Sequence, residues 1–115
     1  MGLDITPEAL QRFLEGGNGP VVLVNLVRLR PGGEDAYRRY GEAVAQLLAR
    51  HGAELVYAGS ALGVLIGEET WDFAAVTRYP SRDALAALVR DPEFEAATPL
   101  RHQAIENGIL HAFTP

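Results

Sequence analysis

Hydrophobic and polar residues alternate along the chain in patterns that predict strands and helices in turn. The run VVLVNLVRLR after Pro20 is β-branched, has the length of a strand and lies between Gly- and Pro-rich turns, so it predicts the first strand. From Glu34 to Arg50 apolar residues recur at steps of three and four, which predicts an amphipathic helix. Gly52 is the expected left-handed residue that ends it.

The second half of the chain predicts two more strands, another helix and a final strand. Strands are expected at 54–58 and 71–79, with a short extension or hairpin arm at 63–66 between them. Ser81 is the expected cap of the second helix. Asp91-Pro92 and Thr98-Pro99 each place a capping side chain before a proline, which predicts two short helical pieces. Asn107-Gly108 should end them, and 109–113 should form the last strand.

A short helix opened by Thr6-Pro7 and closed by Gly16-Gly17 precedes these elements. The order after it is βαββαβ, the arrangement of a ferredoxin-like α+β fold with a four-stranded antiparallel sheet. We therefore divide the chain into an N-terminal helical extension, residues 1–19, and a ferredoxin-like domain, residues 20–115.

Both faces of the first strand are apolar. Alternation along the strand places Val22, Val24 and Leu26 on one face of the sheet. On the opposite face it places Val21, Leu23, Val27 and Leu29. The two crossover helices of a βαββαβ chain cover only one face, and the N-terminal helix is too short to cover the other. A large apolar patch is rarely left in water, so the pattern predicts a homodimer that packs sheet against sheet.

Composition excludes several kinds of chemistry. The chain has 115 residues, enough for one domain; all ten of its basic residues are Arg, and it has no Cys. Schiff-base lysines, thiol nucleophiles and zinc–thiolate sites are therefore excluded. The net charge of −5 and the absence of a basic cluster longer than Arg38-Arg39 argue against nucleic acid as a partner. No signal peptide or membrane span is expected, and the predicted location is the cytoplasm.

No metal or organic cofactor is expected. His102 and Glu106 lie four residues apart, but no neighbouring ligand completes a metal site, and an exposed helical pair is the simpler interpretation. The glycines of EGGNGP precede a strand instead of following one, which is the wrong context for a dinucleotide-binding loop.

Asn25 is the most informative single residue because it interrupts an otherwise apolar strand. A buried amide without a partner costs about 1–3 kcal/mol. It must therefore either tie down a neighbouring segment or contact a ligand. Trp71-Asp72 opens the third predicted strand, where an indole could line a pocket or cover the end of the sheet.

The remaining candidates are basic or aromatic. Arg101 and His102 fall in the first turn of the helix predicted after Thr98, where they would form a small anion site unless they pair with Glu93 or Glu95. His51 ends a helix, and His111 lies on the last strand among apolar neighbours. Histidines in such places are more often structural than catalytic.

The whole pattern from Pro20 onward resembles one bacterial family, the domain of unknown function 1330 family. The residues that carry the resemblance are VVLVNLVRLR, Tyr37, Tyr40, His51-Gly52, LIG at 65–67, Trp71-Asp72, RYPSRDAL, DPEFEAATPLR and IENGILHAF. The resemblance implies a dimeric α+β barrel, in which two ferredoxin-like sheets pack face to face. It also carries over the family's recurring positions, which fall on Asn25, Arg28, Trp71, Asp72, Tyr79, Pro80, Ser81 and Arg101.

Two classes of function follow. The first is a cofactor-independent enzyme of the monooxygenase, isomerase or cyclase type, acting on a small apolar or aromatic metabolite. Its candidate catalytic residues are Asn25, Trp71, Asp72 and His111, and its candidate substrate-binding residues are Arg28, Tyr57, Arg101 and His102. The second is a noncatalytic homodimer that binds a hydrophobic small molecule. A shared cavity for Asn25 and Trp71, with Arg28 or Arg101 at its mouth, is the expected geometry in the first case.

Overall fold

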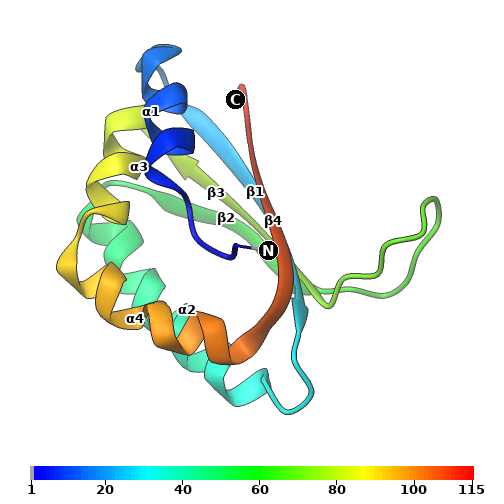
Figure 1. Cartoon of the computed structure of the whole chain (residues 1–115). Coiled ribbons are helices and arrows are strands. Elements are labelled where there is room, and N and C mark those ends of the chain that lie inside the picture. The colour runs from blue at the N-terminus through cyan, green and yellow to red at the C-terminus, as the bar shows by residue number, and fades with distance from the viewer. Residues whose placement is uncertain (1) are drawn as a thin grey trace.

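A computed structural model describes residues 2–115 as an antiparallel sheet covered on one face by helices (Figure 1). The elements follow one another as α1 (Pro7–Glu15), β1 (Val21–Leu29), α2 (Glu34–Arg50), β2 (Glu54–Ser60), β3 (Phe73–Tyr79), α3 (Arg82–Val89), α4 (Pro92–Ala104) and β4 (Ile105–Phe113). The four strands lie in the order β2-β3-β1-β4. This order confirms the predicted ferredoxin-like α+β fold.

The helix starts follow from local capping. Side-chain oxygens of Thr6 and Ser81 accept hydrogen bonds from the backbone N–H groups of Ala9 and Ala84, both at 3.1 Å. Asp91 does the same for Glu93 at 3.0 Å. Each cap satisfies one of the N–H groups that a helix leaves unpaired in its first turn. These starts, and the bounds of α2, are confirmed predictions.

The prediction that Thr98-Pro99 starts a new helix is wrong. Helix α4 runs without interruption from Pro92 to Ala104, with Pro99 inside it. The Thr98 hydroxyl donates to the Phe94 carbonyl at 3.4 Å, so it does not cap the following turn. Helix α4 packs along α2, and this tertiary contact holds the helix together across the one backbone hydrogen bond that the proline cannot make.

The final strand also differs from the prediction. β4 begins at Ile105, directly after α4, and Asn107-Gly108 lies within it instead of ending a helix. The register with β1 shifts between Arg28 and Leu29, opposite this part of β4. Such an irregularity accommodates the Asn-Gly pair within a strand, where it would otherwise favour a turn.

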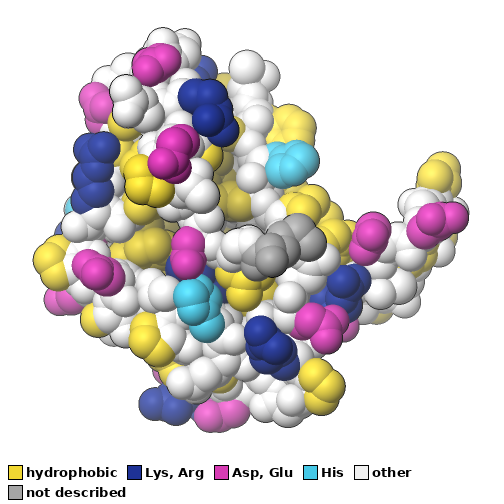
Figure 2. All heavy atoms as spheres, in the orientation of Figure 1, with side chains coloured by type: hydrophobic (Ala, Val, Ile, Leu, Met, Phe, Trp, Pro, Cys, Tyr) yellow, Lys and Arg dark blue, Asp and Glu magenta, His cyan; other side chains and the backbone are white. Residues whose placement is uncertain are grey.

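Residues 61–72 form a long connection between β2 and β3, which we call the arm. The expected strand-like extension at 63–66 is absent from it, and Trp71 and Asp72 precede β3 instead of opening it. The arm projects far from the sheet, on the side away from the helices (Figure 1). Its large side chains are in water, since Leu62, Leu65 and Ile66 are 104%, 101% and 97% exposed. Figure 2 shows acidic and apolar side chains along it.

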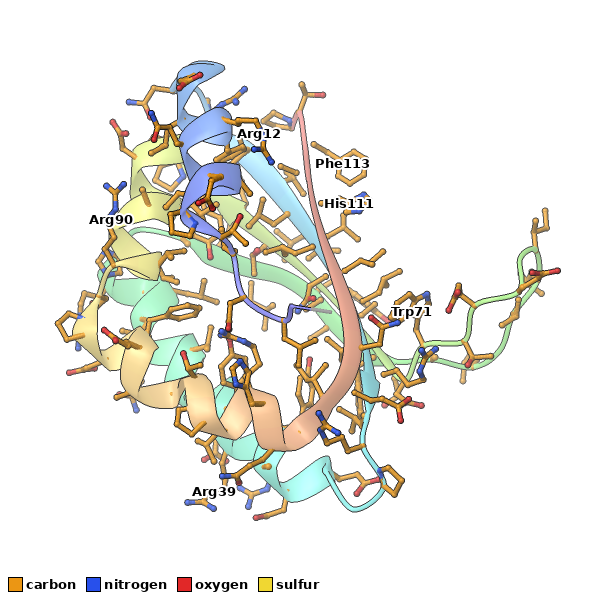
Figure 3. All side chains as sticks on the ribbon, viewed as in Figure 1. Arg12, Arg39, Trp71, Arg90, His111 and Phe113 are labelled. Carbon is orange, nitrogen blue, oxygen red and sulfur yellow. The ribbon has the colours of Figure 1, made fainter. Side chains whose placement is uncertain are left out.

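The two faces of the sheet have different surroundings. Val21, Leu23 and Val27 of β1 point toward the helices and are buried, as the alternation predicts. The alternate residues of β1 point to the other face, which we call the open face, and no helix among residues 2–115 covers it (Figure 1). His111 and Phe113 of β4 point from this face away from the helices (Figure 3).

Candidate functional site

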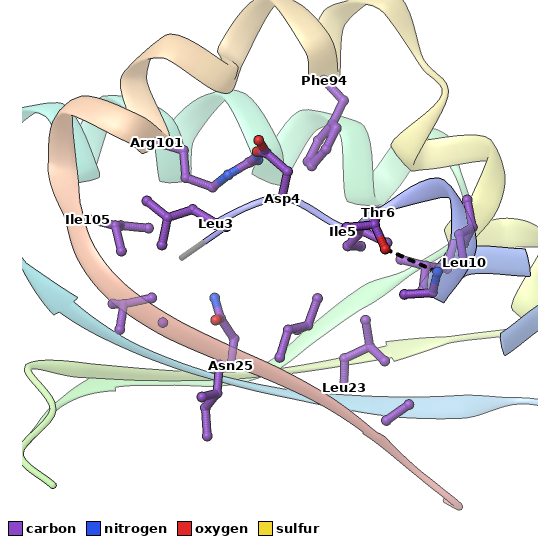
Figure 4. Close-up of a pocket in the computed structure, with 18 of the residues that line it drawn as sticks. Leu3, Asp4, Ile5, Thr6, Leu10, Leu23, Asn25, Phe94, Arg101 and Ile105 are labelled. Atoms are coloured by element: carbon purple, nitrogen blue, oxygen red, sulfur yellow. Dashed lines mark hydrogen bonds and ion pairs between the residues drawn. The ribbon is translucent and has the colours of Figure 1, made fainter. Parts of the chain in front are cut away.

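A cavity of about 420 Å³ lies between the helix-facing side of the sheet, the helices and the chain before α1 (Figure 4). Residues 2–6, which we call the N-terminal segment, run across it without regular secondary structure. In Figure 2 hydrophobic atoms are visible inside a hollow between the helices of this face. The walls are mostly aliphatic or aromatic, and the polar side chains among them are those of Asp4, Thr6, Asn25, Tyr40 and Arg101.

Asn25 projects from the middle of β1 into this cavity (Figure 4). Its cross-strand partners are Ala75 on β3 and Leu110 on β4, whose side chains offer it no polar atom. The Asn25 amide has no side-chain hydrogen bond to any of residues 2–115, so it does not tie down a neighbouring strand or loop among them. The structure therefore shows no structural partner for this amide among residues 2–115, and it places Asn25 at the wall of the cavity.

Arg101 reaches the same cavity from the last turn of α4 and is only 8% exposed. Its Nη1 donates to the Tyr40 hydroxyl at 2.9 Å, and its Nη2 donates to the Asp4 carboxylate. The guanidinium also lies 5.5 Å from the ring centre of Tyr40 and 5.2 Å from that of Phe94. Burial raises the pKa of the Tyr40 hydroxyl, although the Arg101 charge opposes the rise.

Asp4 is the carboxylate that pairs with both basic residues. Its oxygens lie 3.0 and 3.1 Å from Nε2 of His102, in addition to the contact with Arg101. Burial opposes ionisation of Asp4, but the hydrogen bonds from Arg101 and His102 outweigh it, so the pKa of Asp4 lies below its usual value.

The prediction that Arg101 and His102 form an anion site together with the free N–H groups of a helix start is wrong. Because α4 continues through Pro99, both residues lie in its last turn and not in a first turn with free N–H groups. Cations are favoured at that end of a helix. Their partner is Asp4 from the other end of the chain, and not Glu93 or Glu95.

The structure does not bring Trp71 into the cavity with Asn25. Trp71 lies where the arm leaves the sheet (Figure 3), and the Arg28 guanidinium stacks 5.5 Å from its ring centre. Arg28 also bonds Glu106 at 3.0 Å and the Thr70 carbonyl at 3.0 Å. The Asp72 carboxylate accepts the Leu29 N–H at 2.7 Å. Arg28, Trp71 and Asp72 therefore hold the base of the arm against β1.

The other two candidates also lie outside the cavity. His111 of β4 pairs with Val24 and faces the open side of the sheet, and Tyr57 of β2 is 54% exposed. The sequence-predicted site residues thus separate into three places. Asn25 and Arg101 line the cavity with His102 beside it, Arg28, Trp71 and Asp72 hold the arm, and Tyr57 and His111 lie on exposed strand surface.

A second polar cluster joins the end of α2 to the start of α4. The buried Asp91 carboxylate contacts Nε2 of His51 at 2.9 Å and accepts a bond from Arg50 at 3.0 Å. The contacts with His51, the Glu93 N–H and Arg50 lower the pKa of Asp91 to about 2. His51 is therefore part of a structural junction whose charged side chains do not line the cavity.

Within residues 2–115 no three side chains of the metal-ligating types lie close enough together to hold an ion. No helix in the same range combines the length and apolarity needed to cross a membrane.

Fold and cavity together define a small ferredoxin-like protein with a pocket between its sheet and its helices. Residues 26–111 match the family described as Domain of unknown function (DUF1330), and the chain belongs to this family. A protein of unknown function from Rhodopseudomonas palustris is 32% identical, over 98% of this chain and 95% of that chain, with a TM-score of 0.89. No curated protein matches the sequence.

Two more distant structures share the fold and are dimeric. A ferredoxin-like protein of unknown function from Bacteroides fragilis is 20% identical, with a TM-score of 0.63 over 86% of this chain and 99% of that chain. One from Thermobifida fusca is 19% identical, with a TM-score of 0.58 over 86% of this chain and 92% of that chain. The structural neighbours are thus ferredoxin-like proteins, some of them dimeric.

Proposed function

We propose that this protein binds a small, largely apolar or aromatic molecule in the cavity and that a carbonyl or phenol group of this molecule hydrogen-bonds the Asn25 amide. The observation that carries the proposal is an amide in an apolar cavity with no hydrogen-bond partner among residues 2–115. The amide is half-buried and has no competing partner among these residues, and pockets that orient small ligands combine apolar walls with a few polar groups.

A pair of matched ligands tests this proposal. 1-Naphthol and naphthalene have the same aromatic body, but only 1-naphthol offers a hydroxyl to Asn25. We expect 1-naphthol to raise the melting temperature and to bind measurably in calorimetry, and the Asn25→Leu variant to bind it about two- to twelvefold more weakly. One hydrogen bond of about 0.5–1.5 kcal/mol corresponds to that range. Naphthalene should bind the variant at least as well as the wild type.

The stability of the same variant separates ligand contact from a structural role. If Asn25 has no partner within the fold, Asn25→Leu should leave the free energy of unfolding unchanged or raise it. If the amide had a structural partner, this substitution would lower the free energy of unfolding by about 1 kcal/mol or more. Gln46→Leu is the control, because it also replaces an amide side chain with leucine, at an exposed position of α2 outside the cavity and the sheet. Failure of both ligands to bind the wild type would overturn the proposal.

A second candidate function is a cofactor-independent enzyme. Tyr40 favours it: the hydroxyl oxygen accepts from Arg101, so its own proton is available for another acceptor. Tyr40 and Asn25 would then supply two donors to an oxygen that gains negative charge during reaction, as in an enolate. Benzoylacetone tests this possibility, since the protein should accelerate deuterium exchange of its α-protons in D₂O and Tyr40→Phe should slow that exchange. Unchanged exchange in the presence of protein would exclude this activity on β-diketones.

We further propose that the working unit is a homodimer with the two open faces packed together. Two structures that share the fold are dimeric, which supports a dimer. The exposed side chains of Tyr57 and Phe113 and the arm residues Leu62, Leu65 and Ile66 also support it, since a second copy would remove them from water.

A further inference from the structure

Arg101 presents a binding edge that its partners in the fold fill only in part. The Nε and Nη2 atoms of a guanidinium form a flat edge that bonds both oxygens of one carboxylate. Nη2 of Arg101 donates to Asp4, but Nε is buried and has no hydrogen-bond partner among residues 2–115. Asp4 therefore uses one donor of this edge and leaves the other unsatisfied.

The carboxylate at this edge comes from a segment that only side chains anchor, since Leu3 packs against the core cluster around Ile105 and Asp4 forms its ion pairs. No backbone hydrogen bond holds residues 2–5 to the other described residues, and Asp4 keeps 48% of its side chain exposed. In Figure 4 the segment passes between Arg101, which points to it from α4, and Asn25, which points to it from the sheet. The segment thus occupies the space that separates the two polar groups of the cavity.

We infer that the Arg101 edge is the recognition site for the carboxylate of a small acidic ligand and that Asp4 occupies it in the ligand's absence. A buried guanidinium needs an anionic partner, and Asp4 meets that need with incomplete geometry. A ligand carboxylate that bonds Nε and Nη2 together would satisfy the edge and displace the N-terminal segment. Its apolar body would then lie in the cavity toward Asn25. This inference rests on the proposed function, because it uses the same cavity.

Two ligands of equal size but different charge test the inference. 1-Naphthoate carries a carboxylate, and 1-naphthamide is its neutral counterpart. Calorimetry at pH 7 should show tighter binding of 1-naphthoate to the wild type. Asp4→Ala removes the competing carboxylate, so it should strengthen 1-naphthoate binding about tenfold or more and change 1-naphthamide binding less than twofold. Glu8→Ala is the matched control, since it removes the same charge from the exposed face of α1.

Thermal stability gives a second measurement. Asp4→Ala leaves Arg101 without its anionic partner, so its melting temperature should fall, and 1-naphthoate but not 1-naphthamide should restore it. If the variant does not fold by itself, refolding with each ligand gives the same comparison, and Asp4→Asn repeats it with a smaller change of shape. In the wild type, NMR amide signals of residues 3–5 should shift with 1-naphthoate and not with 1-naphthamide.

The outcomes separate this inference from the proposed function. The wild type could bind both ligands equally well, and Asp4→Ala could fail to strengthen 1-naphthoate binding over 1-naphthamide binding. This result would show that the cavity binds small molecules but that Arg101 recognises no carboxylate. Absence of binding by either ligand to either protein would remove both proposals. If Glu8→Ala strengthened 1-naphthoate binding as much as Asp4→Ala does, only the net charge of the protein would matter, and the inference would fail.

Discussion

Substituting Asp at neighbouring positions of β1 tests the proposed dimer interface. Leu23 and Val24 are adjacent, but Leu23 is 3% exposed beneath the helices while Val24 lies on the open face between Val76 of β3 and His111 of β4. Leu23→Asp places a charge in the core and should unfold the protein. Val24→Asp should leave the single protomer folded and act on association instead.

The expected loss of association free energy in Val24→Asp depends on the two-fold symmetry of the proposed dimer. Val24 is already partly buried in the protomer, so most of the cost comes from placing a carboxylate in an apolar interface. A cost of about 1.5–3 kcal/mol per copy is modest for this change, and a symmetric dimer contains the residue twice. Association should therefore weaken by about 3–6 kcal/mol, which is a rise of about 10²–10⁴-fold in the dimer dissociation constant.

Sedimentation or light scattering across nanomolar to micromolar concentrations measures the change, and circular dichroism checks that the protomer is folded. The expected result is a wild-type dimer and a folded Val24→Asp monomer at micromolar concentration. A variant that stays fully dimeric there, or a wild type that is a stable monomer, would refute the packing of open face on open face.

Three further predictions concern the arm, the junction between α2 and α4 and the turn before α2. Leu65→Glu should leave the melting temperature of the protomer unchanged and raise the dimer dissociation constant, as measured by sedimentation; an unchanged constant would remove the arm from the interface. The pKa of Asp91 falls from 3.8 to about 2 on folding, so its ionised form stabilises the fold above pH 4 and this contribution is lost as pH falls toward 2. Urea unfolding should show the free energy of unfolding falling from pH 5 to pH 2, and in Asp91→Asn it should fall less over the same range. Gly33→Ala would bring a Cβ within 2.6 Å of the Ala104 carbonyl oxygen, so chemical denaturation should show a loss of about 1–3 kcal/mol; no loss would mean that the turn moves freely.

Local pattern by itself determined most of the fold. The 3.6-residue spacing of apolar residues gave the bounds of α2, and the side chains of Thr6, Ser81 and Asp91 marked three helix starts. Alternation along β1 separated Leu23 from Val24 correctly. These features depend on residues one to four positions apart, so the sequence contains the information directly. The division of the chain after residue 19 stays a prediction.

Tertiary structure decided the candidate site and the places where the fold departs from the local sequence pattern. Asn25 stood out in the sequence as a polar interruption of an apolar strand, but the sequence did not indicate whether it faced a cavity or a structural partner. Asp4 and Tyr40, which complete the site around Arg101, were missed. Contacts that join residues 97 positions apart, as Asp4 and Arg101 are, have no local pattern that could reveal them. Pro99 remained inside α4 because packing along α2 outweighs one lost backbone bond, a balance that only the folded chain sets.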